Sequence, residues 1–190
     1  AHCALAVARQ TGVRMALVGR SPRPDPADAD DAANEIQSLL KKYAALGLVA
    51  DYFACDVTDR DAVNRMLAAV GDRLGPVTGI IHGAGMNHPR MTGQVSVEQA
   101  YAETAPKVLG LLHLLDALET RPPKLIVGIG SIIGMTGMPG NGWYGFSNEA
   151  MDIILREFAA AHSQTRTANA AYSIWRDEGM GARMGSVAIL

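Results

Sequence analysis

Short apolar runs alternate along this chain with longer segments whose apolar residues recur at helical spacing. The runs at residues 14–20, 49–55, 77–82 and 124–130 have the length and composition of buried strands. Strands that are separated by helices run parallel, because each helix carries the chain back to the edge where the strand began. The sequence therefore predicts an α/β fold with a doubly wound parallel sheet that is covered by helices on both faces.

The segments between these runs supply the helices. We expect helices at residues 1–11, 28–46, 97–119 and 143–162, another from the turn at 56–59 to about residue 74, and a last strand near 169–175. Residues 131–142 are rich in glycine and are expected to form a loop. Ligands of a doubly wound sheet bind at the carboxyl ends of its strands, so the segments that follow the strands are candidate binding segments.

The usual first strand of a dinucleotide-binding sheet, with its Gly-x-Gly-x-x-Gly turn, is not found in the sequence. That strand is central in the sheet, and the helix after its turn holds the pyrophosphate. The glycines at 128, 130 and 134 have the wrong spacing and lead into a loop. We therefore expect residues 1–190 to be a fragment of one dinucleotide-binding domain, with the turn either upstream of residue 1 or absent.

Composition argues against several kinds of partner. The net charge of −2 over 190 residues gives no electrostatic reason to bind nucleic acid or an anionic membrane, and no apolar run approaches the length of a membrane span. Cys3 and Cys55 form no CxxC pair, and the histidines share no metal-ligand spacing. We expect no metal site, interpret the histidines as structural or surface residues, and expect a reducing, cytoplasmic location.

A polar cluster is predicted around the glycine-rich loop. Ser131 ends the run at 124–130, Tyr144 falls on the first turn of the next helix, and Asn148 follows four residues later on the same face. A hydroxyl, a phenol and an amide in this arrangement can bind a carbonyl oxygen. The alternative is a glycine-rich connection that contains these residues by chance.

A tyrosine that donates a proton needs a nearby cation to stabilise its phenolate form. The chain has four lysines, and only Lys107 lies on the helix that follows the glycine-rich turn Gly83–Ala84–Gly85. Lys41 and Lys42 belong to an earlier helix, and Lys124 begins a strand at its far end. Lys107 is therefore the candidate cation, and a surface lysine on an amphipathic helix is the alternative.

These residues together carry a resemblance to a known family. A serine, a tyrosine thirteen residues later, an Asp-Val-x-Asp turn and the Gly83–Gly85 turn resemble the short-chain dehydrogenase/reductase superfamily, whose fold is Rossmann-like. Most of that superfamily has Tyr-x-x-x-Lys and an asparagine on the preceding helix. Here Asn148 and Lys107 are exchanged, which resembles the ketoreductase domain of polyketide and related fatty-acid synthases. Residues 180–186 are similar to the iterative enediyne and polyunsaturated-fatty-acid branch.

The resemblance implies a function and a role for each candidate. The expected reaction is the NADPH-dependent reduction of a β-ketoacyl thioester, held on an acyl carrier protein, within a synthase that has further domains. Tyr144 would donate the proton and Ser131 would bind the carbonyl. Lys107 would assist the phenol and bind the nicotinamide ribose, and Asn148 would support the proton relay.

The same resemblance implies a cofactor site. Arg20 and Ser21 would hold the 2′-phosphate of NADPH, since a guanidinium suits a phosphate. Asp56 and Val57 would line the adenine pocket. The remaining cofactor contacts would come from the backbone of Gly83, Ala84 and Gly85, and from Lys107 and Tyr144. Without the family, Arg20 is as readily a solvated loop charge.

The chain also departs from the family pattern. The Leu-Asp-Asp of one stereochemical class is replaced in residues 86–91, and the tryptophan of the opposite class is Thr136 here, so product stereochemistry stays open. Two other functions remain possible from the sequence. One is a free-standing short-chain reductase of a small ketone, and the other is a non-catalytic structural domain of a synthase.

Overall fold

The computed structural model describes residues 2–23 and 31–173. The similarity noted at residues 180–186 lies outside these ranges. By its internal contacts the chain divides into two compact units, Ala1–Val77 and Thr78–Leu190, and each is described here by itself.

The first unit is a two-stranded parallel sheet with three helices. Its elements are α1 (His2–Thr11), β1 (Met15–Gly19), α2 (Asp31–Ala45), β2 (Ala50–Ala54) and α3 (Arg60–Leu74). The strands pair in register from Met15 with Ala50 to Gly19 with Ala54. The Asp59 side chain accepts a hydrogen bond from the Ala62 N–H at 3.0 Å, which caps α3 at its start.

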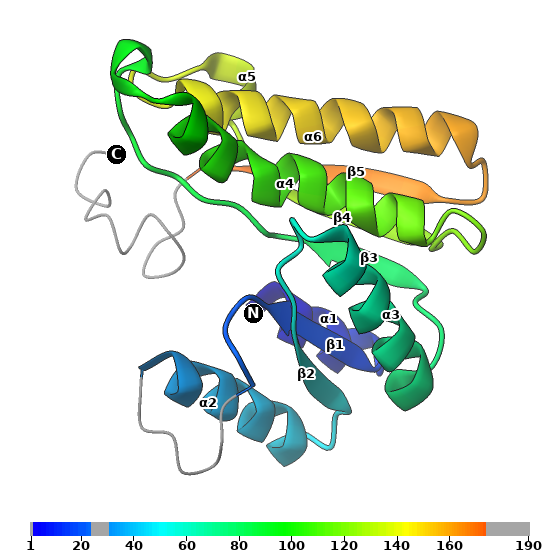
Figure 1. Ribbon diagram of the computed structural model, residues 1–190. Helices are drawn as coiled ribbons and strands as arrows, with labels where there is room; N and C mark the ends of the chain where they lie inside the picture. The colour runs from blue at the N-terminus through cyan, green and yellow to red at the C-terminus, as the bar shows by residue number, and fades with distance from the viewer. Residues whose placement is uncertain (1, 24–30, 174–190) are drawn as a thin grey trace. The chain divides into compact units, whose positions relative to one another are not determined.

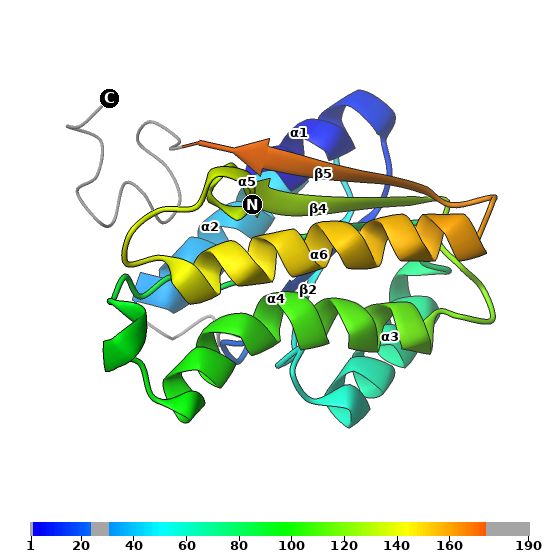
Figure 2. The ribbon, with the colours of Figure 1, turned by 90° about the horizontal axis from the view of Figure 1, so that it is seen from above.

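The second unit contains a three-stranded parallel sheet in the order β3-β4-β5. Its elements are β3 (Gly79–His82), η1 (Thr92–Gln94), α4 (Val97–Ala117), β4 (Leu125–Ser131), α5 (Ile133–Thr136), α6 (Gly142–Ala161) and β5 (Arg166–Tyr172). Helices α4 and α6 pack side by side, and α6 also lies against β4 and β5 (Figures 1 and 2). The parallel sheets with flanking helices confirm the predicted Rossmann-like α/β class.

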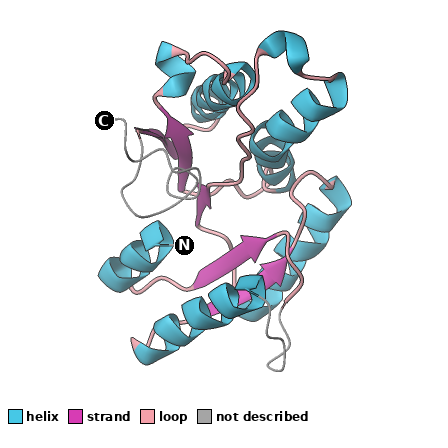
Figure 3. Cartoon of the chain, turned by 90° about the vertical axis from the view of Figure 1, so that its left-hand side faces the viewer, coloured by secondary structure: helices cyan, strands magenta, loops and turns pink. Residues whose placement is uncertain are grey.

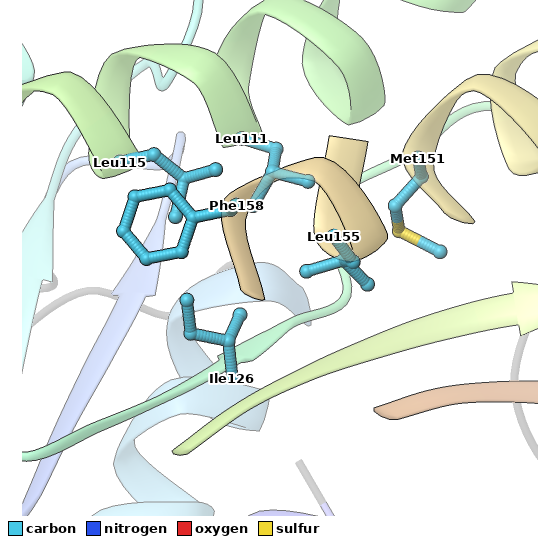
Figure 4. Packing of buried hydrophobic residues seen from close by; sticks show 6 residues of the cluster. All are labelled: Leu111, Leu115, Ile126, Met151, Leu155 and Phe158. Carbon is cyan, nitrogen blue, oxygen red and sulfur yellow. The ribbon is translucent and has the colours of Figure 1, made fainter. Parts of the chain in front are cut away.

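The core of the second unit lies between α4, α6 and β4. Its buried residues are Leu111, Leu115, Ile126, Met151, Leu155 and Phe158 (Figure 4). Full burial of each side chain of this size contributes about 1.5–3 kcal/mol relative to exposure. Gly128 lets α6 approach β4 closely, because a Cβ atom there would lie only 2.8 Å from Leu155 Cδ1.

Helix α4 has a regular start and one interior irregularity. Ser96 and Gln99 form a capping box, in which each side chain bonds the backbone N–H of the other residue. Pro106 lies inside the helix and has no N–H to donate to the carbonyl of Ala102, the residue four positions earlier. The Ala102 carbonyl therefore lacks its usual helical partner.

The structure departs from the predicted elements at two places. The glycine-rich stretch after β4 was expected to be a loop, but Ile133–Thr136 form the short helix α5, drawn separately from the pink loops in Figure 3. The last strand begins at Arg166 rather than near residue 169, because pairing with β4 starts at Leu125. Apolar periodicity does not reveal a single helical turn, or a strand start as polar as Arg-Thr.

Within the described ranges, no helix is long and apolar enough to cross a membrane. No group of three or more His, Cys, Asp or Glu side chains in the same ranges is arranged to hold a metal ion.

Candidate active site

Ser131 is the last residue of β4, and its hydroxyl is held by the next turn. Ser131 Oγ accepts a hydrogen bond from the backbone N–H of Ile133 at 3.3 Å. A hydroxyl has one proton to donate as well as lone pairs to accept. Because an acceptor position is already used, Ser131 is suited to donate its proton to an incoming oxygen.

Tyr144 and Asn148 lie on the first turns of α6, as predicted, and both are buried. The Tyr144 hydroxyl makes no hydrogen bond with any other described residue. Asn148 Nδ2 donates to the Tyr144 carbonyl at 2.8 Å, which fixes the amide, while Asn148 Oδ1 is buried and has no partner among the described residues. A buried acceptor without a donor is unfavourable, so this oxygen is suited to a bound polar group.

Lys107 is buried on α4, with only 3% of its surface exposed. Its Nζ donates to the carbonyl of Ile129 in β4 at 2.9 Å. Burial in an apolar environment lowers the pKa of this amine from its usual value to about 8. The alternative of a surface lysine is therefore wrong, and the amine is held two residues before Ser131.

His82, at the end of β3, is a site neighbour that sequence reasoning treated only as structural. Its Nε2 lies 3.0 Å from the Lys107 carbonyl, and it is 3% exposed. Desolvation, and then the Lys107 cation, lower the pKa of His82 to about 4, so the ring is neutral at pH 7. Since a carbonyl only accepts, Nε2 carries the ring proton and donates it to the Lys107 backbone.

Two glycines bring α5 against α6 beside these residues. A Cβ on Gly134 would lie 3.0 Å from Asn148 Cβ and 3.1 Å from the Glu149 backbone nitrogen. A Cβ on Gly145 would lie 3.3 Å from the Ile133 carbonyl oxygen. The segment that leaves Ser131 therefore rests directly on the turn of α6 that carries Tyr144 and Asn148.

We expect Gly134→Ala to lower the free energy of unfolding by about 1–3 kcal/mol, because the added methyl group meets backbone atoms of α6 that cannot move independently. Chemical denaturation of the full-length polypeptide measures the change. Gly93→Ala is the matched control, since a Cβ there meets no atom within 4 Å. Equal stability of the Gly134 and Gly93 variants would contradict the close contact.

The predicted phosphate and adenine residues lie in the first unit, after β1 and β2. Asp56 Oδ1 accepts from the Thr58 N–H at 2.9 Å and from the Thr58 hydroxyl at 2.7 Å. These hydrogen bonds, and then the nearby charge of Arg20, lower the pKa of the Asp56 carboxyl. Arg20 and Asp56 are thus close enough to interact, as expected for residues at neighbouring strand ends.

Arg20 and Arg23 differ in their ion pairing with the described residues. Arg23 is paired with Asp51 at 2.7 Å, whereas exposed Arg20 forms no ion pair with any described residue. Tyr52 was not predicted to contribute, but its hydroxyl donates to the Ser21 carbonyl at 2.7 Å and so holds this turn. Val57 lies in the turn after β2 and makes a contact within the described structure.

Gly83–Gly85 follow β3, and the closest approach is at Gly85. A Cβ there would lie 3.1 Å from Lys107 Cε and 3.3 Å from Nζ, so the missing side chain leaves room for the lysine. The buried amine and the unpartnered Asn148 oxygen are polar groups of the kind that bind ribose hydroxyls. The residues present therefore fit a nicotinamide nucleotide.

Large apolar side chains are exposed near the catalytic candidates. Met135 on α5 is 77% exposed, Met138 in the following loop 55%, and Met91 before η1 60%. Phe146, two residues after Tyr144, is 54% exposed. Methionine adapts to irregular apolar partners, so this surface suits an apolar chain.

The comparison with known families decides the assignment. The sequence model of the KR domain matches residues 1–176. This chain belongs to the KR domain family. It is a ketoreductase domain of polyketide synthases, in the short-chain dehydrogenase/reductase superfamily, which confirms the resemblance found in the sequence.

The chain matches short stretches of much longer synthases. The ketoreductase chain is 31% identical over 134 residues to the PKS-NRPS hybrid synthetase cheA of Chaetomium globosum, covering 70% of this chain and 3% of that protein. It is 27% identical over 180 residues to polyketide synthase PksL of Bacillus subtilis, covering 92% and 4% respectively. The chain therefore spans only a few per cent of the length of these two relatives.

Solved ketoreductases share the fold. The domain from the bacillaene assembly line is 30% identical, with a TM-score of 0.79 over 94% of this chain and 42% of that one. The ketoreductase of the first phoslactomycin module of a Streptomyces species is 29% identical, with a TM-score of 0.80 over 94% and 39%. The ketoreductase fold therefore extends over nearly all of this chain.

Proposed function

We propose that this domain reduces a β-ketoacyl thioester on an acyl carrier protein to the β-hydroxyacyl thioester, using NADPH, within a polyketide or fatty-acid-like synthase. The observation that carries the proposal is the state of two hydroxyl groups. The Tyr144 hydroxyl has no hydrogen-bond partner among the described residues, and the Ser131 hydroxyl has an acceptor position filled and its proton available. Both are suited to bind a ketone oxygen.

NADPH supplies the hydride when it is bound. Ser131 donates a hydrogen bond to the ketone oxygen and orients it. Tyr144 gives its phenolic proton to the same oxygen as negative charge develops there. This charge-directed proton transfer yields the hydroxyl group of the product.

Lys107 and Asn148 support the proton transfer. The buried Lys107 amine provides the positive charge that stabilises the phenolate left on Tyr144. We assign the nicotinamide ribose to the same amine, with Asn148 Oδ1 as a second polar contact in the relay that returns a proton. We assign the backbone of Gly83, Ala84 and Gly85 to the cofactor, Asp56 and Val57 to its adenine, and Ser21 with Arg20 to its 2′-phosphate.

The substrate class is supported by the surface and by the relatives. The exposed side chains of Met91, Met135, Met138 and Phe146 suit an acyl chain. Two of the similar proteins are named as a PKS-NRPS hybrid synthetase and a polyketide synthase, which supports a substrate of the polyketide class. The neighbouring domains of such a synthase would be the partners of this domain.

We expect the full-length polypeptide to use NADPH in preference to NADH, and Arg20→Ala to remove most of that preference. A charge-assisted hydrogen bond contributes about 1.5–3 kcal/mol, which is roughly ten- to a hundredfold in kcat/KM. The measurement is kcat/KM for both cofactors with a β-ketoacyl thioester. Arg65→Ala is the control, because Arg65 is a 72% exposed arginine on α3. Equal use of both cofactors by the wild type would refute the assignment of Arg20.

A further inference from the structure

A small pocket with a mixed polar and apolar lining lies at the start of α4, about one turn before Lys107, and none of the roles above uses it. It encloses about 170 Å³ at the start of α4 and in the segment that precedes it. Its lining residues are His88, Arg90, Val95, Gln99, Ala102 and Glu103. Ligand pockets usually span about 300–1,000 Å³, so this one suits a single group of a longer molecule.

Glu103 is the unusual member of the pocket wall. Its side chain is only 5% exposed, yet the carboxylate forms no ion pair with a described residue. Among the described residues, its carboxylate accepts one hydrogen bond, a long one of 3.4 Å from the His88 backbone N–H. One long hydrogen bond offsets little of the free energy that is needed to remove a carboxylate from water, so this carboxylate is suited to accept a further hydrogen bond.

The pocket offers acceptors and donors on different residues. Ala102 lines the pocket beside Glu103, and because Pro106 leaves its carbonyl without the usual helical partner, this carbonyl is a candidate second acceptor. Gln99 uses its Oε1 to cap α4 at 3.1 Å, which leaves its Nε2 protons to donate, and the Arg90 guanidinium is a donor only. A group that both donates and accepts, such as a secondary amide, complements this set.

A cation fits the pocket less well. Arg90 places a positive charge in the same lining, and Glu103 is its single carboxylate. The described residues contain no group of three His, Cys, Asp or Glu arranged for a metal. A neutral amide avoids repulsion from the guanidinium and still uses the carboxylate.

The pocket is tied to both catalytic helices. Glu103 lies one turn before Lys107 on the same face of α4, about 6 Å along the axis. The Arg90 N–H donates to the Gly140 carbonyl at 2.7 Å, four residues before Tyr144. In a β-ketoacyl thioester on a pantetheine arm, a secondary amide follows the sulfur by two methylene groups. The chain of bonds between that amide and the reacting carbonyl lets an arm that is seated in the pocket extend beyond Glu103 toward Lys107.

We propose that this pocket binds the secondary amide of the substrate's pantetheine arm nearest the sulfur, with Glu103 accepting its N–H and Arg90 or Gln99 donating to its C=O. The inference rests on the proposed function and adds to it a recognition site for the arm. Val95 contributes an apolar contact for the adjoining methylene groups. Such a site would fix the position of the thioester relative to Tyr144.

The test compares two substrates that differ by one atom. One is a β-ketoacyl N-acetylcysteamine thioester, and the other is its analogue with an ester oxygen in place of the amide N–H. For the full-length wild-type polypeptide we expect kcat/KM to be at least about tenfold higher for the amide, since a hydrogen bond to a carboxylate contributes about 1.5–3 kcal/mol. In Glu103→Leu this ratio should fall to near one.

Two more variants make the result interpretable. Glu103→Gln keeps the shape but weakens the acceptor, so its ratio should be at least about threefold below wild type, and it decides the matter if Glu103→Leu does not fold. Glu98→Gln changes an exposed carboxylate at the start of the same helix and should keep the wild-type ratio. A wild type that does not discriminate, or Glu103 variants that discriminate as wild type does, would overturn the amide site.

The same measurements separate this inference from the proposed function. If both thioesters are reduced but their ratio does not depend on Glu103, the amide site falls and the reductase remains. If the wild type reduces neither thioester, the proposed substrate class falls and the amide site falls with it.

Discussion

Replacing Tyr144 by phenylalanine is expected to lower the rate of β-ketoacyl reduction by about a thousandfold, within the range of roughly 10²–10⁴ that general acid catalysis contributes. The substitution removes one oxygen atom and leaves the ring in place. The Tyr144 hydroxyl makes no hydrogen bond with a described residue, so its loss should not weaken the fold. The measurement is single-turnover reduction with saturating NADPH in the full-length polypeptide.

Tyr101→Phe is the matched control for this experiment. Tyr101 also lies in the second unit, on α4, but is 58% exposed. Loss of its hydroxyl should leave the rate within about twofold of wild type, as is usual for surface positions. A Tyr144→Phe variant that turns over at the same rate as Tyr101→Phe would show that another group donates the proton.

Lys107→Met is expected to lower kcat by at least about a hundredfold, because the phenolate that forms on Tyr144 would lose the cation that we propose for it. A cation within about 4–6 Å shifts a proton equilibrium by one to a few units, each of which corresponds to roughly tenfold in rate if fully expressed. Asn148 carries no charge and cannot replace it. The methionine side chain is of similar length, so the packing of α4 is retained. Lys124→Met, on an exposed lysine at the start of β4, should have little effect.

The pH dependence of the same reaction gives a second readout. Burial lowers the pKa of Lys107 to about 8, so its charge is present below that pH and is lost as the pH rises through it. Wild-type reduction should therefore decline above about pH 8. In Lys107→Met this decline should be absent, because the variant has no amine at position 107 to lose its charge. An unchanged rate and pH profile would show that the exchange of lysine and asparagine has no catalytic meaning.

For Lys107, the sequence was enough to identify the residue as the candidate cation but not to predict its surroundings. Elimination among four lysines identified it, because only Lys107 lies on the helix that follows the third apolar run. Its burial, its bond to Ile129 and its contact with His82 could not be predicted, since they depend on how closely α4 approaches β3 and β4. The fold class could be predicted because the spacing of apolar residues and the length of apolar runs are local properties of the sequence. The catalytic and cofactor roles assigned to individual residues stay predictions.

The features that sequence reasoning missed depend on tertiary contacts. Glutamate is usually a surface residue, and the residues next to Glu103 in the sequence do not indicate that its side chain is only 5% exposed. Gly134 was interpreted as a loop glycine, whereas its lack of a side chain allows α5 to contact α6. Pro106 was visible in the sequence, but its effect on the Ala102 carbonyl requires knowing that α4 continues through it.

The division of the chain near Val77 also has a consequence for inheritance. Arg20 and Asp56, which we propose for cofactor recognition, are encoded before this point, and Lys107, Ser131 and Tyr144 are encoded after it. A recombination crossover near Val77 would replace the first set and leave the second in place. With the roles that we propose, such a crossover would change the cofactor preference and leave the residues for carbonyl reduction unchanged.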